Sequence, residues 1–205
     1  MSVASRRQEL LSLLQDHSTD DVAELVHRQG MLQLLARAGD PFARDHMVPG
    51  HLTASAFVVT PDFGQLLLIF HGKLRRWLQP GGHFEPADED CVAAARREVA
   101  EETGLDDVQL VRALFDLDVH AIPAIKADPA HLHFDVRSLF VAAQRGGVAA
   151  SDALGLRWVP LDEVNALESD ASVMRAVRRL QLMRAGRGSE KGVAILVSAF
   201  QSPRA

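Results

Sequence analysis

The segment from residue 81 to residue 105 constrains the fold most, because it joins a tight turn to a strongly predicted helix. It reads GGHFEPADEDCVAAARREVAEETGL. Acidic residues at 88–90 would complement the positive end of a helix dipole, and three alanines at 93–95 are strong helix formers. Gly104 stands where a left-handed cap ends a helix. Residues 89–103 are therefore predicted to form one helix, with a glycine-rich turn before it.

Three carboxylates of this helix share one stripe. At about 100° per residue, Glu98, Glu101 and Glu102 fall at about 0°, 300° and 40°. Carboxylates at such spacing repel one another, and a divalent cation with oxygen ligands offsets that repulsion. A solvated acidic face is the simpler interpretation of such a stripe in an arbitrary helix. The adjacent Gly81–Gly82 turn favours a binding site, because glycines let a ligand approach the backbone closely.

The segment resembles the signature of the Nudix hydrolase family (MutT-like). The run Arg97-Glu98-Val99-Ala100-Glu101-Glu102-Thr103-Gly104-Leu105 matches the second half of that signature without a gap. The family pattern has five residues between its glycine and its first acidic residue, but six separate Gly82 from Glu89. Either Asp88 or Glu89 could therefore fill the acidic position. The flanking stretches 77–80 and 157–164 are also similar to parts of the family.

The resemblance implies a chemistry and a set of residues. A water would attack phosphorus in a nucleoside-diphosphate derivative and cleave a phosphoanhydride bond, with Mg²⁺ or Mn²⁺ as the cofactor. Carried over, Glu101, Glu102 and the carbonyl of Gly82 would be metal ligands. Glu98 would be a ligand or the base that activates the water. Arg97 would orient the glutamates through charge-assisted hydrogen bonds.

Other residues are candidates for the base or for substrate contacts. Some family members place the base outside the motif, and Asp152 is the first candidate here, with Asp135, Glu163 and His133 as alternatives. The competing interpretation of Asp152 is an ordinary turn residue. His83 and Glu85 would contact substrate. His131 and His133 share one face of a strand, so they could form a second metal site or contact phosphate, although a hydrogen-bonded strand face is the simpler interpretation.

The rest of the chain predicts an α+β protein. Leucines at three- and four-residue spacing predict a helical hairpin over residues 5–38. Strands are predicted at 51–60, 65–70, 107–119, 131–143 and 157–159, and helices at 161–167 and 170–184. The resemblance makes this a Nudix fold, an α/β/α sandwich around a mixed sheet, with an N-terminal helical extension. The expected divisions are 1–45 for the extension, 46–184 for the Nudix domain and 185–205 for a linker and tail.

Composition narrows the class of protein. The chain carries 22 Lys and Arg against 27 Asp and Glu, a formal net charge of −5, which argues against binding a nucleic-acid polymer. Its only cysteine, Cys91, excludes an internal disulfide, so a cytoplasmic location is expected. Within the helix this cysteine is interpreted as a small buried residue. The apolar runs are too short to span a bilayer. The expected partner is a small molecule, and a homodimer is compatible with the family.

Three other functions compete with hydrolysis. The first is a Nudix-fold regulator that binds a nucleotide or metabolite without cleaving it, but such proteins commonly lose motif glutamates. The second is an isopentenyl diphosphate isomerase, which would need a cysteine and glutamate pair that the sequence does not show. The third is a structural protein in which the motif is unused. The balanced charges of the helical hairpin argue against a DNA-reading appendage and favour a role in covering the sheet or joining subunits.

Overall fold

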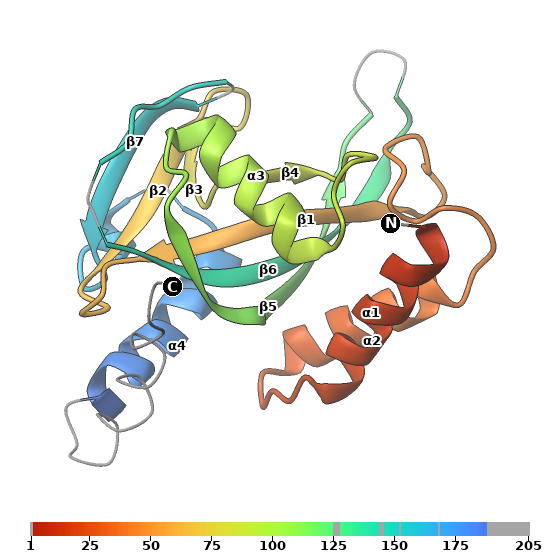
Figure 1. Cartoon of the computed structure of the whole chain (residues 1–205), viewed down its shortest axis with the longest axis horizontal. Coiled ribbons are helices and arrows are strands. Elements are labelled where there is room, and N and C mark those ends of the chain that lie inside the picture. The colour runs from red at the N-terminus through yellow and green to blue at the C-terminus, as the bar shows by residue number, and fades with distance from the viewer. Residues whose placement is uncertain (1, 125–127, 144–145, 152, 168, 188–205) are drawn as a thin grey trace, which may run out of the picture.

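The computed structural model describes residues 2–124, 128–143, 146–151, 153–167 and 169–187. A seven-stranded mixed sheet lies at its centre, and helices pack against it from more than one side (Figure 1). The predicted α+β class and the helical N-terminal region are confirmed. The elements in chain order are α1 (Val3–Asp16), α2 (Val22–Leu35), β1 (Gly50–Val59), β2 (Gln65–His71), β3 (Arg76–Leu78), β4 (Gly81–His83), α3 (Cys91–Thr103), β5 (Val108–Ile122), β6 (His131–Ala142), β7 (Ala153–Pro160), a 3₁₀ turn (Val164–Ala166) and α4 (Ala171–Arg187).

The sheet is organised around β1. Its main path runs β3-β2-β1-β6-β5, while β4 pairs with β1 and β7 pairs with β2. Strands β1 and β6 run parallel over their whole shared length, and the other pairs are antiparallel. Strand β1 pairs with β2 at its end, at Val59, and with β4 in its middle, over residues 53–55. Strand β1 therefore connects the glycine-rich β4 to the rest of the sheet.

Both faces of β1 are covered, which explains its sequence. Leu52 and Val58 join one apolar cluster with residues of α3 and the N-terminal helices, whereas Phe57 and Val59 join a second cluster with α4. All ten residues of the strand are buried. Where both faces meet these clusters, residues 56–59 are apolar at successive positions, whereas the polar His51, Thr53 and Ser55 share one face of the first half of the strand.

A buried glutamate of α2 joins the N-terminal helices to β5 and α4. Glu24 of α2 is fully buried, where His17, Thr19 and Arg179 of α4 all contact its carboxylate. The backbone amide of Leu117 in β5 also donates to Glu24, at 3.2 Å. Burial alone would raise the pKa of Glu24, but the hydrogen bonds lower it to about 2. The helical pair thus packs on the sheet and α4, as the covering role requires.

Several boundaries differ from the sequence-based predictions. The stretch 161–167 forms only the 3₁₀ turn Val164–Ala166 rather than a longer helix. The strand predicted at 157–159 extends over Ala153–Pro160, because β2 supplies a full antiparallel partner. Helix α3 begins at Cys91, with Asp90 as its N-cap, and ends at Gly104 in the left-handed conformation. No described helix is both long and apolar enough to cross a membrane. Residues 188–205, most of the expected tail, lie outside the described residues.

Candidate active site

Helix α3 holds the motif glutamates beside β4. The Glu102 side chain is buried and its Oε2 accepts a hydrogen bond from the Gly81 amide at 2.9 Å. The Glu98 side chain is 12% exposed and that of Glu101 is 49% exposed, so the stripe runs from the interior to solvent. Burial raises the pKa of Glu98 above its ordinary value. The three residues thus form a graded acidic edge rather than a fully solvated face.

Gly82 leaves room for the Glu98 carboxylate. A Cβ atom at Gly82 would lie 2.5 Å from Oε1 and 2.9 Å from Oε2 of Glu98. No carbon atom tolerates such contacts, so a side chain at this position would displace the carboxylate. The absence of a Cβ lets the acidic edge lie directly against the backbone of β4, which supports the prediction that the Gly82 carbonyl and the glutamates serve one ligand.

Arg97 connects this edge to the preceding loop. Its Nη1 donates to Glu98 and Glu101, each at 3.0 Å, and its Nη2 donates to the backbone carbonyl of His83 at 2.7 Å. Its Nε and Nη2 donate to the Asp88 carboxylate at 3.1 and 3.0 Å. The contact with the Asp88 carboxylate raises the pKa of Arg97 against the opposing effect of burial. One guanidinium thus orients two motif glutamates and fixes the loop.

The same contacts resolve the acidic position that the sequence left open. Asp88 is buried and forms a bidentate pair with Arg97, while its Oδ2 also accepts from the Glu85 amide at 2.7 Å. Glu89 is exposed. Asp88, the register with five residues after Gly82, is therefore the acidic residue that anchors Arg97.

The remaining candidates are distributed unevenly. The Glu85 side chain is 57% exposed, with its Oε2 4.0 Å from Arg97 Nε. His83 is half-buried at the end of β4. Glu163 is exposed beside the 3₁₀ turn. Asp152 lies outside the described residues, so its assignment as the base stays a prediction, as do the roles given to the other site residues.

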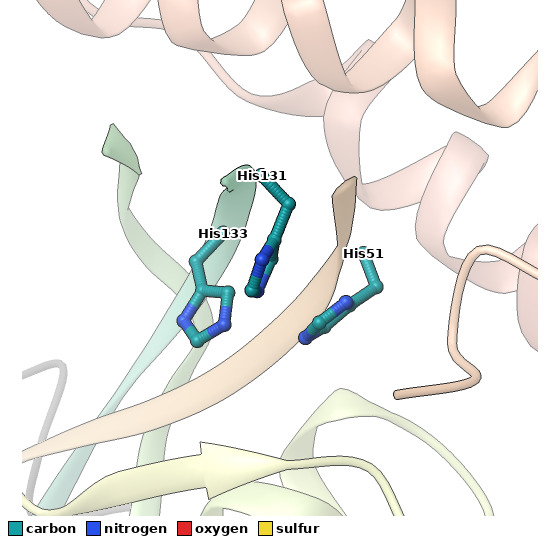
Figure 2. A group of neighbouring side chains, drawn as sticks. All are labelled: His51, His131 and His133. Atoms are coloured by element: carbon teal, nitrogen blue, oxygen red, sulfur yellow. The ribbon is translucent and has the colours of Figure 1, made fainter. Parts of the chain in front are cut away.

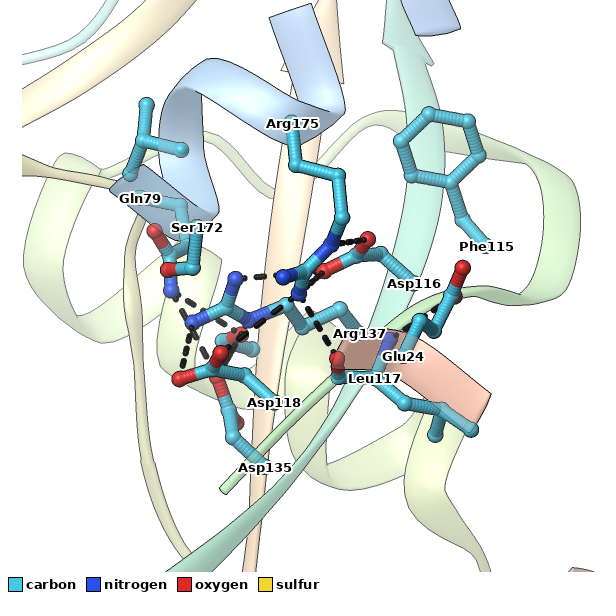
Figure 3. A network of polar contacts seen from close by, with 12 residues as sticks. Glu24, Gln79, Phe115, Asp116, Leu117, Asp118, Asp135, Arg137, Ser172 and Arg175 are labelled. Carbon is cyan, nitrogen blue, oxygen red and sulfur yellow. Dashed lines mark hydrogen bonds and ion pairs between the residues drawn. The ribbon is translucent and has the colours of Figure 1, made fainter. Parts of the chain in front are cut away.

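Asp135 has a structural partner set that the sequence did not reveal. Its carboxylate accepts from Thr53 at 3.1 Å, Ser55 at 2.8 Å and Arg137 at 2.7 Å, all in the interior. Arg137 is the hub of a buried ion network that also includes Asp116, Asp118 and Arg175 (Figure 3). These donors give Asp135 a structural role within the buried network, and its candidacy as the base stays a prediction.

The charged residues of this network recur at every second position along two strands. Asp116 and Asp118 alternate on β5, and Asp135 and Arg137 alternate on β6. Cross-strand register places Asp116 opposite Arg137 and Asp118 opposite Asp135. Alternating charges on two consecutive predicted strands could have indicated a buried polar face, but only their register shows that the charges balance one another.

Several histidines gather next to the acidic edge. His131 and His133 lie on one face of β6 and meet His51 of β1, which the sequence analysis had not singled out. The ligand atoms of these three lie within 4.8 Å of one another, and they form the only such group of three or more found among the described residues. Burial lowers the pKa of His51 and of His83 to about 4, and it also lowers that of His133. These imidazoles are therefore neutral at physiological pH.

The carboxylates fit a hard divalent cation by their chemistry. Mg²⁺ and Mn²⁺ take carboxylate and carbonyl oxygens, which the α3 stripe and β4 offer together. Glu98 and Glu101 face Arg97 in this arrangement, and the three motif glutamates are not drawn into one tight cluster. A cation would therefore compete with Arg97 for carboxylate oxygens. Each carboxylate has two oxygens, so one can contact Arg97 while the other binds the cation.

Comparison with known proteins identifies the family. The family model described as NUDIX domain matches residues 49–180. No curated protein matches. Among solved structures, a NUDIX-family hydrolase from Clostridium perfringens is 24% identical, with a TM-score of 0.49, covering 65% of this chain and 97% of its own.

Two other structures superpose slightly better. An Ap4A hydrolase from C. elegans is 16% identical with a TM-score of 0.50, covering 66% of this chain and 98% of its own. The E. coli dihydroneopterin triphosphate pyrophosphohydrolase is 17% identical with a TM-score of 0.51, covering 62% and 92%. At these identities the likeness shows the fold. The match of the family model over most of the chain shows membership: this protein belongs to the NUDIX family, and its class is that of a Nudix-type pyrophosphohydrolase.

Proposed function

We propose that the chain is a metal-dependent hydrolase that cleaves a phosphoanhydride bond in a nucleoside diphosphate linked to another moiety. The observation that carries this proposal is the acidic edge of α3 held against β4, where Gly82 leaves space for Glu98 and Gly81 donates to Glu102. Arg97 fixes the edge from the other side. A carboxylate set this close to bare backbone is suited to a cation that also contacts phosphate oxygens.

The proposed roles follow from the positions. Glu101, Glu102 and the Gly82 carbonyl would hold Mg²⁺ or Mn²⁺, which when bound polarises phosphoryl oxygens and lowers the pKa of water. Glu98 would be a further ligand or the proton acceptor for the attacking water. Arg97 would hold the glutamates in orientation through charge-assisted hydrogen bonds.

The proposed substrate class is broader than the substrate named for any one relative. The relatives named above act, by their names, on Ap4A and on dihydroneopterin triphosphate. Both compounds contain phosphoanhydride bonds, so they belong in a substrate panel together with nucleoside triphosphates, ADP-ribose and nucleotide sugars. His83 and Glu85 are the proposed substrate contacts, because both flank the loop that Arg97 anchors to α3.

The first experiment measures product release from this panel with Mg²⁺ or Mn²⁺. Glu102→Gln should lower kcat at least about 100-fold on the substrate that the wild type cleaves, about 2.7 kcal/mol of transition-state stabilisation. Glu89→Gln is the matched control, because Glu89 is exposed in the same loop-helix segment. Equal activity of Glu102→Gln and wild type would contradict the metal-carboxylate mechanism.

The substrate panel also distinguishes hydrolysis from the alternative function, binding without cleavage. If the wild type cleaves nothing but binds a nucleotide or metabolite, the protein is a non-hydrolysing Nudix-fold regulator. The complete set of motif glutamates argues for the hydrolase. A cytoplasmic location and a homodimeric assembly stay predictions from the sequence.

A further inference from the structure

Five histidines converge on one face of the sheet from four strands. Strand register places His51 opposite His133 and His133 opposite His120, while His131 is two residues before His133 on the same face. His83 of β4 stands opposite Thr53, two residues beyond His51 on the same face of β1. The ring centroids of His51 lie 4.7 Å from His133 and 5.0 Å from His131 and His83. Residues far apart in sequence thus form one imidazole cluster beside β4.

Two of these rings are oriented by backbone carbonyls. His131 Nδ1 lies 2.8 Å from the Pro129 carbonyl, and His51 Nδ1 lies 3.4 Å from the His46 carbonyl. A carbonyl only accepts, so each Nδ1 carries the proton and each Nε2 carries a lone pair. A backbone carbonyl on one ring nitrogen is the usual way in which proteins orient a histidine that binds metal through the other nitrogen.

In the part of the chain that the structure describes, no group donates a hydrogen bond to the Nε2 lone pair of His51. Its residue is 1% exposed, and Nε2 is a buried atom without a hydrogen-bond partner. A buried polar atom left unpaired destabilises the fold. Figure 2 shows the rings of His51, His131 and His133 gathered on one face of the paired strands β1 and β6. Packing alone does not explain why the unpaired Nε2 of His51 faces a group of other imidazoles.

We propose that His51, His131 and His133 bind one divalent transition-metal ion of the Zn²⁺ type, at a centre separate from the α3 carboxylates. Their ligand atoms lie within 4.8 Å of one another. Tetrahedral zinc with bonds of about 2.0–2.1 Å needs ligand nitrogens about 3.4 Å apart. Side-chain rotations that shift the ring nitrogens by about 1 Å bring them to that spacing. Three imidazole nitrogens select zinc, cobalt or nickel over magnesium, which prefers oxygen. The fourth position is then left to water or another oxygen ligand. This centre does not depend on the proposed hydrolysis.

The test uses the untagged full-length chain, stripped with a chelator and dialysed. Zn²⁺ is titrated by calorimetry, bound zinc is counted by elemental analysis, and Co²⁺ is added separately to record its visible absorption. We expect one zinc per chain and the intense bands of tetrahedral cobalt. His131→Gln and His133→Gln should each weaken zinc binding by more than about 100-fold, beyond the effect of losing a residue that only orients a ligand.

Two control variants separate this site from the carboxylates and from surface histidines. Glu102→Gln removes a proposed magnesium ligand, and His71→Gln removes an imidazole at the end of β2; both should keep one zinc with wild-type affinity. Circular dichroism melts verify folding, and the cobalt spectrum of the wild type needs no variant. The proposal is overturned if wild type binds no stoichiometric zinc, if cobalt stays octahedral, or if zinc is lost with Glu102 and retained by both histidine variants.

Discussion

Replacing Gly82 with alanine should disable the active site without unfolding the protein. The new Cβ would lie 2.5 Å from Glu98 Oε1, whereas ordinary contact begins at 3.4 Å, so the carboxylate must retreat by about 0.9 Å. The clash is with the end of a flexible side chain, and Gly82 is not among the glycines with positive φ. The backbone therefore accepts alanine. A misplacement of about 1 Å in a catalytic group costs about 100-fold in rate, so kcat should fall by that factor.

The assay combines three measurements on Gly82→Ala. Hydrolysis of the substrate from the panel reports kcat, Mn²⁺ affinity by electron paramagnetic resonance reports the ligand geometry, and a thermal melt reports stability. Gly155→Ala is the control, because its Cβ would meet Trp77 and Phe70 at ordinary distances of 3.5 and 3.6 Å. Wild-type kcat and Mn²⁺ affinity in a folded Gly82→Ala would refute the argument that the Glu98 position against β4 matters.

Two further predictions concern the buried charges. Asp88→Asn should reduce kcat by about 10- to 100-fold, since it weakens the bidentate contact that orients Arg97, while Glu89→Gln should leave kcat unchanged; the reverse pattern would restore Glu89 to the motif position. Glu24→Gln should lower the free energy of unfolding in urea by about 3 kcal/mol, because Arg179 loses a buried partner. The folded pKa of Glu24 is about 2 against an ordinary 4.5, so its stabilisation is complete above pH 4.5 and lost as the pH falls toward 2. Wild-type stability should therefore decline more steeply than that of Glu24→Gln below pH 4.5, and parallel declines would contradict this assignment.

Local pattern was enough to predict the main helix and the long strands. The alanine run and Gly104 determine α3 through helix propensity and capping, which depend on neighbours in the chain. The strands expected at 51–60 and 65–70 also followed from local pattern, and they correspond to β1 and β2. The three-carboxylate stripe was also readable, because a helix of known period fixes which side chains share a face.

What the sequence did not show depends on contacts between distant segments. The choice between Asp88 and Glu89 follows from which carboxylate reaches Arg97 across a loop, and spacing alone allowed both. His51 was overlooked because its only signal is its register with His133, on a strand 82 residues away. Such pairings come from sheet topology, in particular the parallel β1 and β6, which no local periodicity specifies.

Strand β4 links the acidic edge to the histidine cluster through its backbone and its side chain separately. The His83 carbonyl accepts from Arg97, while the His83 ring lies 5.0 Å from the ring of His51. The Gly81 amide donates to Glu102 in the same short strand. Because substitutions on β6 leave these backbone contacts in place, a change in hydrolysis caused by His131→Gln or His133→Gln would act through the imidazole cluster rather than through Arg97. A change in zinc binding caused by Gly82→Ala would instead show that β4 transmits displacement from one centre to the other.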